Sequence, residues 1–397
     1  MPYIKQTRRA FIGTAAGALG AGAWSRFATA EGMALPTAPV SLNIIDVAGN
    51  LALTQKAFEA YRKAKPNLVS KITFTKAPAP ELPGKIKAQQ DAGRVDIDMV
   101  LTGSDALAAG MDQKLWVELL PALAGNLPKL DDILLPAAIK MQGLARGQGL
   151  IVVTSPGGPL LEYDPERVKK PPTSAEELLA WAKANPNRFM YARPANSGPG
   201  RAFLMGLPYI LGDKNPTDPV GGWDKTWDYL KAINEYVEYY PTGTGTTMKE
   251  LGEGSRDIIT TMTGWDINPR ALGVVPKSAA IQTIKGFHFI TDGHYMCVPK
   301  GLAADKMAVL LDLMSYMLSK EAQAMTYDDG YFYPGPAIKG VPIDMAPAES
   351  QAVIKEFGRP EYEKMIAETP AELPLDPDKM VVAFRMWDER VGAKTKK

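Results

Sequence analysis

Trp265 and Asp266 stand side by side within residues 258–270, just after a short run rich in Ile and Thr and a break at Gly264. An aromatic face beside a carboxylate, at the end of a strand, suits a small polar or cationic ligand. A packed tryptophan followed by a turn aspartate is the alternative interpretation, because tryptophan more often serves packing. We expect this stretch to cross between two lobes and to line the cleft between them.

Polar residues also follow two strands predicted in the first third of the chain. Residues 41–47, 71–76 and 96–101 predict strands separated by helices, and this order indicates an α/β lobe with a largely parallel sheet. Such sheets bind ligands beyond the carboxyl ends of their strands. The candidate ligand-binding residues at these ends are Asp46, Asn50, Thr102 and Ser104. Ordinary turn and helix-capping chemistry is the alternative.

A third candidate segment, residues 193–201, is a Ser/Gly turn between a predicted strand and a predicted helix. Such a turn exposes backbone N–H groups, so Asn196, Ser197 and Arg201 could hold a carboxylate, a phosphonate or a sugar hydroxyl. The segment lacks the Gly-Lys-Ser/Thr of a phosphate loop. A plain helix start is the alternative. Tyr331 opens an aromatic loop, 331–336, that we expect to form a wall of the cleft.

The residues needed for catalysis or metal binding are scarce. The chain has two histidines, His288 and His294, and neither has a metal-ligand partner at helical spacing. Cys297 is the single cysteine and lies in an apolar run, which predicts a buried, inert thiol. The Gly-x-Ser-x-Gly and Gly-x-Gly-x-x-Gly signatures are missing. We therefore expect no metal, no cofactor and a binding protein rather than an enzyme.

The N-terminal thirty residues resemble an export signal rather than part of the fold. A twin-arginine pattern at 7–12 precedes a weakly apolar run at 13–24, and small residues at 28–30 predict cleavage near Ala30. The run is too short and too weakly apolar to span a membrane. We expect a twin-arginine (Tat) signal peptide at 1–30 and a periplasmic mature protein.

The mature chain is too long for one ordinary core and has no basic excess. The full sequence has 397 residues and a net charge of +1, and all the charged residues of 1–30 are basic. Removing them leaves a small acidic excess, which argues against nucleic acid or an anionic membrane as a partner. The length favours two lobes.

Further along the chain, residues 287–290 and 294–299 predict paired strands around a turn at 291–293.

Several patterned stretches resemble one family. Residues 41–64, 85–101, 171–183, 252–265 and 295–323 resemble the family 1 extracellular solute-binding proteins of ABC importers, in the branch that includes spermidine/putrescine binders. The resemblance implies a bilobed periplasmic-binding-protein fold of type II. Lobe one would take 31–147 and 267–320, and lobe two 148–266 and 321–397.

The resemblance also implies a function and partners. A monomer would capture a small solute (polyamine, amino-acid-like, phosphonate or sugar) between its lobes, close around it and dock on an ABC permease in the inner membrane. In polyamine binders of this branch a tryptophan and an acid near the hinge hold the amine, and Trp265 and Asp266 could match them. An exported enzyme that acts on a small solute is one alternative, and a binder without a transport role is another.

Overall fold

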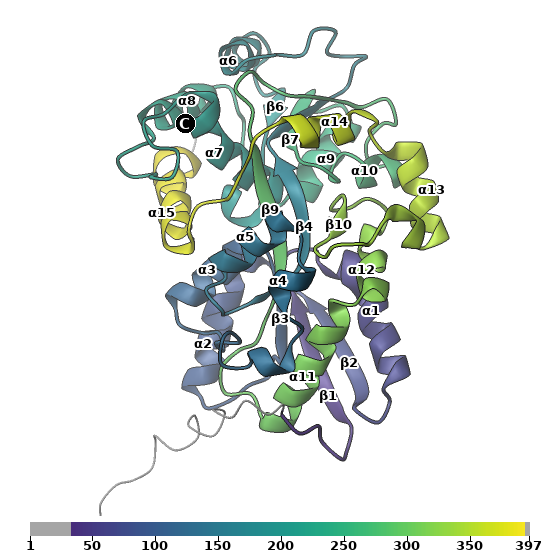
Figure 1. Cartoon of the computed structure of the whole chain (residues 1–397). Coiled ribbons are helices and arrows are strands. Elements are labelled where there is room, and N and C mark those ends of the chain that lie inside the picture. Colours follow the sequence, from purple (N-terminus) through teal and green to yellow (C-terminus); the bar gives the residue numbers. More distant parts are fainter. Residues whose placement is uncertain (1–32, 394–397) are drawn as a thin grey trace, which may run out of the picture.

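The strands form two sheets, and the larger one lies in the lower half of Figure 1. The computed structural model describes residues 33–393. Within them the larger sheet has seven strands in the order β10-β4-β9-β3-β1-β2, with β11 paired to β9. Its strands are β1 Val40–Asp46, β2 Val69–Lys76, β3 Met99–Thr102, β4 Leu150–Gly158, β9 Phe289–Cys297, β10 Gly335–Pro336 and β11 Ala371–Glu372. β1 pairs in parallel with β2 and β3, whereas β9 is antiparallel to β3 and β4.

Helices separate the strands of this sheet along the chain. These helices are α1 Leu51–Ala64, α2 Leu82–Asp91, α3 Ser104–Asp112, α4 Leu130–Ile133, α5 Pro136–Leu144, α11 Ala304–Met317 and α12 Lys320–Ala324. One buried apolar cluster fills the space between helices and sheet, and it includes Ile44, Phe58, Val100 and Leu310. The alternation of strand and helix that the sequence predicts is therefore confirmed for this lobe, and the protein is of the α/β class.

The smaller sheet lies in the upper half of Figure 1 and has four strands in the described residues, in the order β6-β7-β5-β8. The strands are β5 Leu160–Tyr163, β6 Phe189–Met190, β7 Ile258–Thr261 and β8 Ala280–Gln282. Its helices are α6 Ala175–Ala184, α7 Gly198–Ile210, α8 Asp224–Asn234, α9 Thr244–Gly252, α10 Asn268–Ala271, α13 Ala348–Phe357 and α14 Glu361–Glu368. A second apolar cluster, with Phe203, Trp227 and Leu230, fills this half.

Local sequence explains where the helices of the second half begin. Ser174 is the N-cap of α6, and its Oγ accepts a hydrogen bond from the backbone N–H of Glu177 at 3.2 Å. The Glu177 carboxylate in turn accepts from the backbone N–H of Thr173 at 2.7 Å. Two free N–H groups at the helix start thus find partners, as the Ser-x-x-Glu spacing predicts.

β4 and β9 join the two halves and are the long central strands of Figure 1. Every residue of β9 is buried, and β4 continues directly into β5 of the other sheet. The two strands predicted at 287–290 and 294–299 are thus one strand, and the turn expected at 291–293 is wrong. Asp292 and Gly293 pair with Ser155 and Thr154 of β4, and this pairing keeps the backbone of β9 extended there.

Two segments lie with the opposite sheet from the one that the sequence division assigns. β8 falls within 267–320, yet it pairs with β5 of the smaller sheet. Residues 327–346 fall within 321–397, yet Tyr327, Phe332 and Ala337 belong to the core of the larger sheet. Strand pairing and core packing decide these positions, and neither can be read from local periodicity.

The C-terminal helix, α15 Pro377–Trp387, contacts both halves. Ala383 of α15 lies in the same buried cluster as Ala108 of α3, and Trp387 donates a hydrogen bond from Nε1 to the Tyr191 hydroxyl at 3.1 Å. In Figure 1 this helix stands beside α8, at the level where the two halves meet. The predicted signal peptide lies outside the described residues, and within 33–393 no helix is long and apolar enough to cross a membrane.

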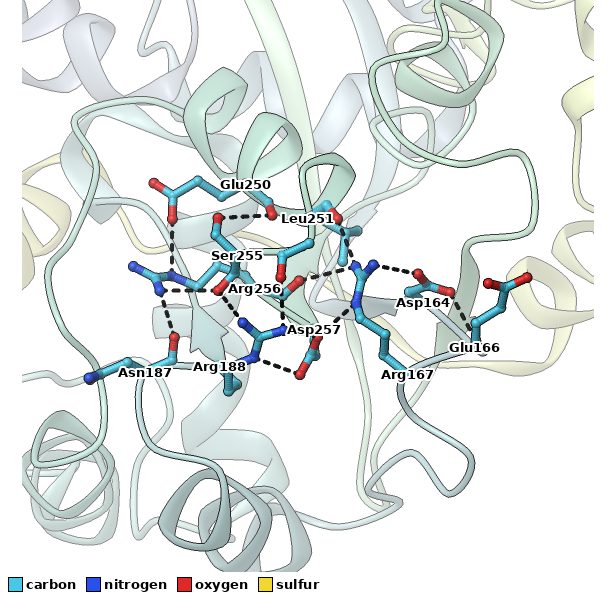
Figure 2. A network of polar contacts seen from close by, with 11 residues as sticks. Asp164, Glu166, Arg167, Asn187, Arg188, Glu250, Leu251, Ser255, Arg256 and Asp257 are labelled. Atoms are coloured by element: carbon cyan, nitrogen blue, oxygen red, sulfur yellow. Dashed lines mark hydrogen bonds and ion pairs between the residues drawn. The ribbon is translucent and has the colours of Figure 1, made fainter.

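A network of arginines and acids, away from the junction of the halves, fastens the far end of the smaller sheet (Figure 2). Asp257, just before β7, accepts hydrogen bonds from Arg167 Nε at 2.8 Å and from Arg188 Nε at 2.8 Å. Arg167 also pairs with Asp164, and Arg256 pairs with Glu250 at 3.0 Å. The network connects the loops around β5, β6 and β7 to the end of α9, so it stabilises the smaller sheet.

Candidate functional site

A cavity of about 290 Å³ lies where the two halves face each other. The end of β1 and the loop after β3 form one side of it, and the N-termini of α7 and α9 form the other. Residues of the central strand β9 and of the loops after β7 and before β10 complete the lining. The cavity therefore lies beyond the carboxyl ends of β1 and β3, where open α/β sheets bind ligands.

Arg201 of α7 lines this cavity and pairs with two carboxylates. Its Nη1 donates to Asp105 Oδ2 of α3 at 3.0 Å, and its Nη2 donates to Asp292 Oδ2 of β9 at 2.8 Å. The Arg201 side chain is only 5% exposed. Burial disfavours its charge, but Asp292 and Asp105 outweigh that effect and raise the pKa of Arg201 above its ordinary value. The Arg201–Asp105 pair joins the two halves of the protein across the cleft.

Asp46, the last residue of β1, lines the cavity and also starts α1. Its Oδ1 accepts from the backbone N–H groups of Ala48 at 2.9 Å and Asn50 at 3.0 Å, and its Oδ2 accepts from Leu51 at 2.9 Å. The positive end of α1 thus compensates a carboxylate that is 2% exposed. Both sequence interpretations of Asp46, helix capping and a place at the cleft, describe this geometry.

The opposite rim of the cavity carries hydroxyl and amide groups. Ser197 is the N-cap of α7, where its Oγ accepts from the backbone N–H of Gly200 at 3.1 Å. The same hydroxyl shares a hydrogen bond of 2.7 Å with Thr244 Oγ1 at the start of α9. Asn196 donates through Nδ2 to the carbonyl of Thr242. These bonds fix the rim and join the starts of two helices.

Aromatic side chains form one wall. The rings of Trp265 and Tyr331 contact each other with centroids 4.8 Å apart. Gly49 has a φ of +76°, and a Cβ at this position would lie 2.0 Å from the Tyr331 hydroxyl. Glycine is therefore required here both for its backbone conformation and for the seat of Tyr331. Burial, with Asp46 and Asp328 nearby, raises the pKa of Tyr331, so its ring lines the cavity as a neutral phenol.

His294 of β9 adds a buried imidazole next to Phe332, with ring centroids 4.5 Å apart. It is 4% exposed, and its Nδ1 has no hydrogen-bond partner in the described residues. Burial lowers the pKa of His294, although Asp292 and Asp46 oppose the shift. An imidazole with an unpartnered nitrogen therefore lines the cavity. Within residues 33–393, no group of three or more His, Cys, Asp or Glu residues could hold a metal ion.

Residues 56–354 match the family model described as a bacterial extracellular solute-binding protein. The chain belongs to this family. The match covers most of the chain and confirms the resemblance to extracellular solute-binding proteins that the sequence indicates. No match to a curated protein sequence reaches significance.

Solved structures confirm the fold of this solute-binding protein. A periplasmic thiamin-binding protein is similar with a TM-score of 0.63 at 14% identity, over 92% of this chain and 100% of that chain. The spermidine/putrescine-binding protein PotD from Streptococcus pneumoniae is similar with a TM-score of 0.58 at 13% identity, over 87% and 99% of the chains. Iron-bound HitA from Pseudomonas aeruginosa reaches 0.60 at 18%, over 87% and 99%. The fold is therefore the type II periplasmic-binding-protein fold.

The solute-binding protein brings six of its ten predicted site residues around one cavity. They are Asp46, Asn196, Ser197, Arg201, Trp265 and Tyr331. They come from sequence positions almost 300 residues apart, and the cavity is where their separate strand and helix ends meet.

The other four predicted residues do not line the cavity. Asn50 is fully buried, and its Oδ1 accepts a hydrogen bond from Thr54 at 2.6 Å. Thr102 donates to the carbonyl of Gly103 at 3.0 Å, and Ser104 is 4% exposed in the first turn of α3. Each of these residues lies next to a residue that lines the cavity. The sequence therefore predicted the correct segments but the wrong residues within them.

Asp266 is the fourth, and it points away from the cavity into a buried ion-pair cluster. It is 0% exposed and accepts from Arg359 Nε at 2.7 Å, from Arg270 Nη2 at 3.3 Å and from the Tyr362 hydroxyl. Arg359 lies 93 residues further along the chain, so sequence gave no sign of this partner. The geometry supports a structural role for Asp266, whereas Trp265 lines the cavity.

Among the cavity residues that the sequence did not single out are two acids, Asp105 and Asp292, and the imidazole of His294. Asp105 lay within a segment already chosen, next to the residues that were named. Asp292 was predicted to lie in a turn. His294 was predicted to lie in a strand, with no metal-ligand partner at helical spacing. A continuous strand prediction through 287–299 would have placed both on a central strand, where a polar residue indicates a site.

Proposed function

We propose that this chain is the periplasmic substrate-binding component of an ABC importer. It captures a small polar solute in the cavity between its two halves, closes around it and delivers it to a permease in the inner membrane. The observation that carries this proposal is the polar cavity between two separately cored halves, spanned by the Arg201–Asp105 pair. A solute bound there would contact both halves at once, so binding would favour the closed arrangement.

The proposal includes lobe boundaries that follow the two cores. Lobe one takes 33–157 and 291–346, and lobe two takes 158–290 and 347–393, with β4 and β9 as hinge strands. The titles of similar structures, which name a thiamin binder, a spermidine/putrescine binder and an iron-bound protein, support a transport role in which the ligand differs between proteins. We propose export by the twin-arginine pathway with cleavage near Ala30, action as a monomer, and no chemical change of the solute.

The solute would contact residues from each part of the cavity. Asp46, Asp105, Asp292 and His294 face it from lobe one and the hinge strand, Asn196, Ser197, Arg201 and Thr244 from lobe two, and Trp265 and Tyr331 from the aromatic wall.

A thermal-shift screen with periplasmic extract fractions, followed by small-angle scattering, tests this function. The cognate solute at about a hundredfold its Kd should add roughly 2.7 kcal/mol to the free energy of unfolding. It should also reduce the radius of gyration. Trp265→Ala should abolish both effects, while Tyr239→Ala, a change at an exposed aromatic outside the cavity, should keep them. Chemical conversion of the bound solute, or stabilisation without compaction, would overturn the proposal.

A further inference from the structure

We propose that the solute is a small organic cation with an apolar or aromatic body, such as an amine, a quaternary ammonium compound or a cationic heterocycle. This inference rests on the proposed function and names the chemical class that the same cavity selects. The charges in the cavity, the bonds already made by Arg201 and the nature of the wall each support it.

The buried charges of the cavity are mostly negative. Three buried or nearly buried carboxylates line it, from Asp46, Asp105 and Asp292, and only one buried cation, Arg201. Lys76 also lines the cavity but is exposed, so water and salt screen its charge. Three carboxylates against one guanidinium leave the buried set with an excess of negative charge. A charge in a site with little water interacts strongly, so this excess favours a positively charged solute.

Each terminal nitrogen of Arg201 already donates to a carboxylate, to Asp105 at 3.0 Å and to Asp292 at 2.8 Å. An anionic solute could use the remaining N–H groups of Arg201 only while remaining close to both carboxylates, whose charges would repel it. Two of the helix starts around the cavity are partly occupied, because Asp46 takes three N–H groups at α1 and Ser197 takes one at α7. The starts of α3 and α9 have no side-chain cap among the described residues, so the preference for a cation depends on the excess of carboxylates rather than on a lack of donors.

The carboxylates, by contrast, retain capacity for a further donor. Each carboxylate oxygen can accept two hydrogen bonds. The Oδ2 atoms of Asp105 and Asp292 accept one bond each, from Arg201. An ammonium or a ring N–H of a solute could therefore share these oxygens without displacing Arg201. Asp105 lies on α3 of lobe one and Asp292 on the hinge strand β9, so one cation could contact both carboxylates beside Arg201 of lobe two.

The wall explains why the cation should have an apolar body. Trp265, Phe332 and Met262 line the cavity, and the faces of aromatic rings attract cations within about 6 Å. The Nδ1 atom of His294 has no partner in the described residues, so it can form one hydrogen bond with a polar group of the same solute. A cavity of about 290 Å³ limits the solute to a small molecule.

Matched pairs of solutes test the charge preference directly. Calorimetry would compare choline with 3,3-dimethylbutan-1-ol, its neutral counterpart of the same shape, and putrescine with 1,4-butanediol. Thiamin and spermidine would widen the cationic panel, and phosphate, L-glutamate and D-glucose would represent the other classes. At least one cation should bind, with an affinity tenfold or more above that of the neutral and anionic probes. The affinity should fall as salt concentration rises.

Two variants that each remove a positive charge from the cavity lining should change the affinities for cations and for anions in opposite directions. Lys76→Gln should raise the affinity for the cation two- to threefold, and Lys71→Gln, an exposed lysine on the same strand but outside the cavity, should leave it unchanged. Arg201→Gln should keep or raise cation affinity, because it leaves two carboxylates without their partner. If Arg201→Gln does not fold, Asp105→Asn replaces it, with an expected tenfold loss.

The outcomes separate this inference from the proposed function. Binding of only an anion or a neutral sugar, lost in Trp265→Ala, would overturn the cation class and leave the transport role standing. A loss of binding in Lys76→Gln would also overturn it. If no cation of the panel binds, the inference fails, whereas the transport role fails only if periplasmic fractions also produce no compaction.

Discussion

Replacement of Asp266 by asparagine separates the two roles considered for this residue, because each predicts a different defect. Asp266 is 0% exposed and pairs with Arg359, which is 12% exposed, and with Arg270, which is 6% exposed. Asn keeps the shape but removes the charge, so two guanidinium groups would stay buried with little compensation. Removing one partner of such a pair typically costs about 3–5 kcal/mol.

A second buried acid reduces this expected loss. Glu162 of β5 is 0% exposed, and neither of its carboxyl oxygens has a hydrogen-bond partner in the described residues. Burial and the neighbouring Asp266 raise the pKa of Glu162 from 4.5 to about 8, so it is mostly neutral at pH 7. Without the charge of Asp266, Glu162 would ionise more readily and replace part of the missing charge. We therefore expect about 3 kcal/mol for Asp266→Asn alone.

The double variant tests this compensation. Asp266→Asn with Glu162→Gln should lose more stability than the sum of the two single changes, because contacting residues are not additive. Urea unfolding at pH 7 measures the three free energies of unfolding, and calorimetry with the cleft solute measures its Kd. Asp266→Asn should change the Kd less than threefold. A hundredfold loss of affinity with less than about 1 kcal/mol of destabilisation would refute the structural role and restore Asp266 as a ligand contact.

Three further outcomes follow from single positions. Because the pKa of Glu162 is raised in the folded protein, its contribution to stability is full below pH 4.5 and is lost as pH rises through about 8. Glu162→Gln should remove roughly 4 kcal/mol of this pH dependence in urea titrations between pH 5 and 9, and an unchanged slope would contradict the burial argument. Asp257→Asn should cost about 2–3 kcal/mol, because Arg167 and Arg188 both bond to this carboxylate, without any change of Kd. Gly49→Ala should lower solute affinity about tenfold by moving Tyr331 off its seat, whereas Gly93→Ala, at a similar φ of +66° but with nothing within 4 Å of the added Cβ, should only cost stability. Equal effects of the two glycine changes on Kd would show that Tyr331 does not contact the solute.

The sequence was sufficient wherever a feature depends on near neighbours in the chain. The sequence predicts the Ser174 cap of α6 because the N-cap and the residue that it bonds are three positions apart. It also predicts the segments around Asp46 and Ser197, because strand ends and helix starts carry small and polar residues. The apolar stripe with Trp227 and Leu230 also packs inward as its helical spacing predicts.

The sequence did not predict the position of a side chain where residues in similar local patterns have different partners in the tertiary structure. Trp265 and Asp266 are adjacent, yet one lines the cavity and the other meets Arg359 in a buried cluster. Asp292 resembles a turn residue beside Gly293, yet pairing with β4 keeps the chain extended there, and Asp292 bonds to Arg201.

The sequence by itself determined the α/β class, the resemblance to extracellular solute-binding proteins and the segments that form the cleft. Only the tertiary structure decided which side chain of each segment lines the cavity, and which stretches pack with which sheet. The physical reason is that periodicity, caps and turns depend on contacts a few residues apart. The cavity of this protein is made by charges such as Asp105, Arg201 and Asp292, which lie about 90 residues or more from one another and meet only when the sheets have formed.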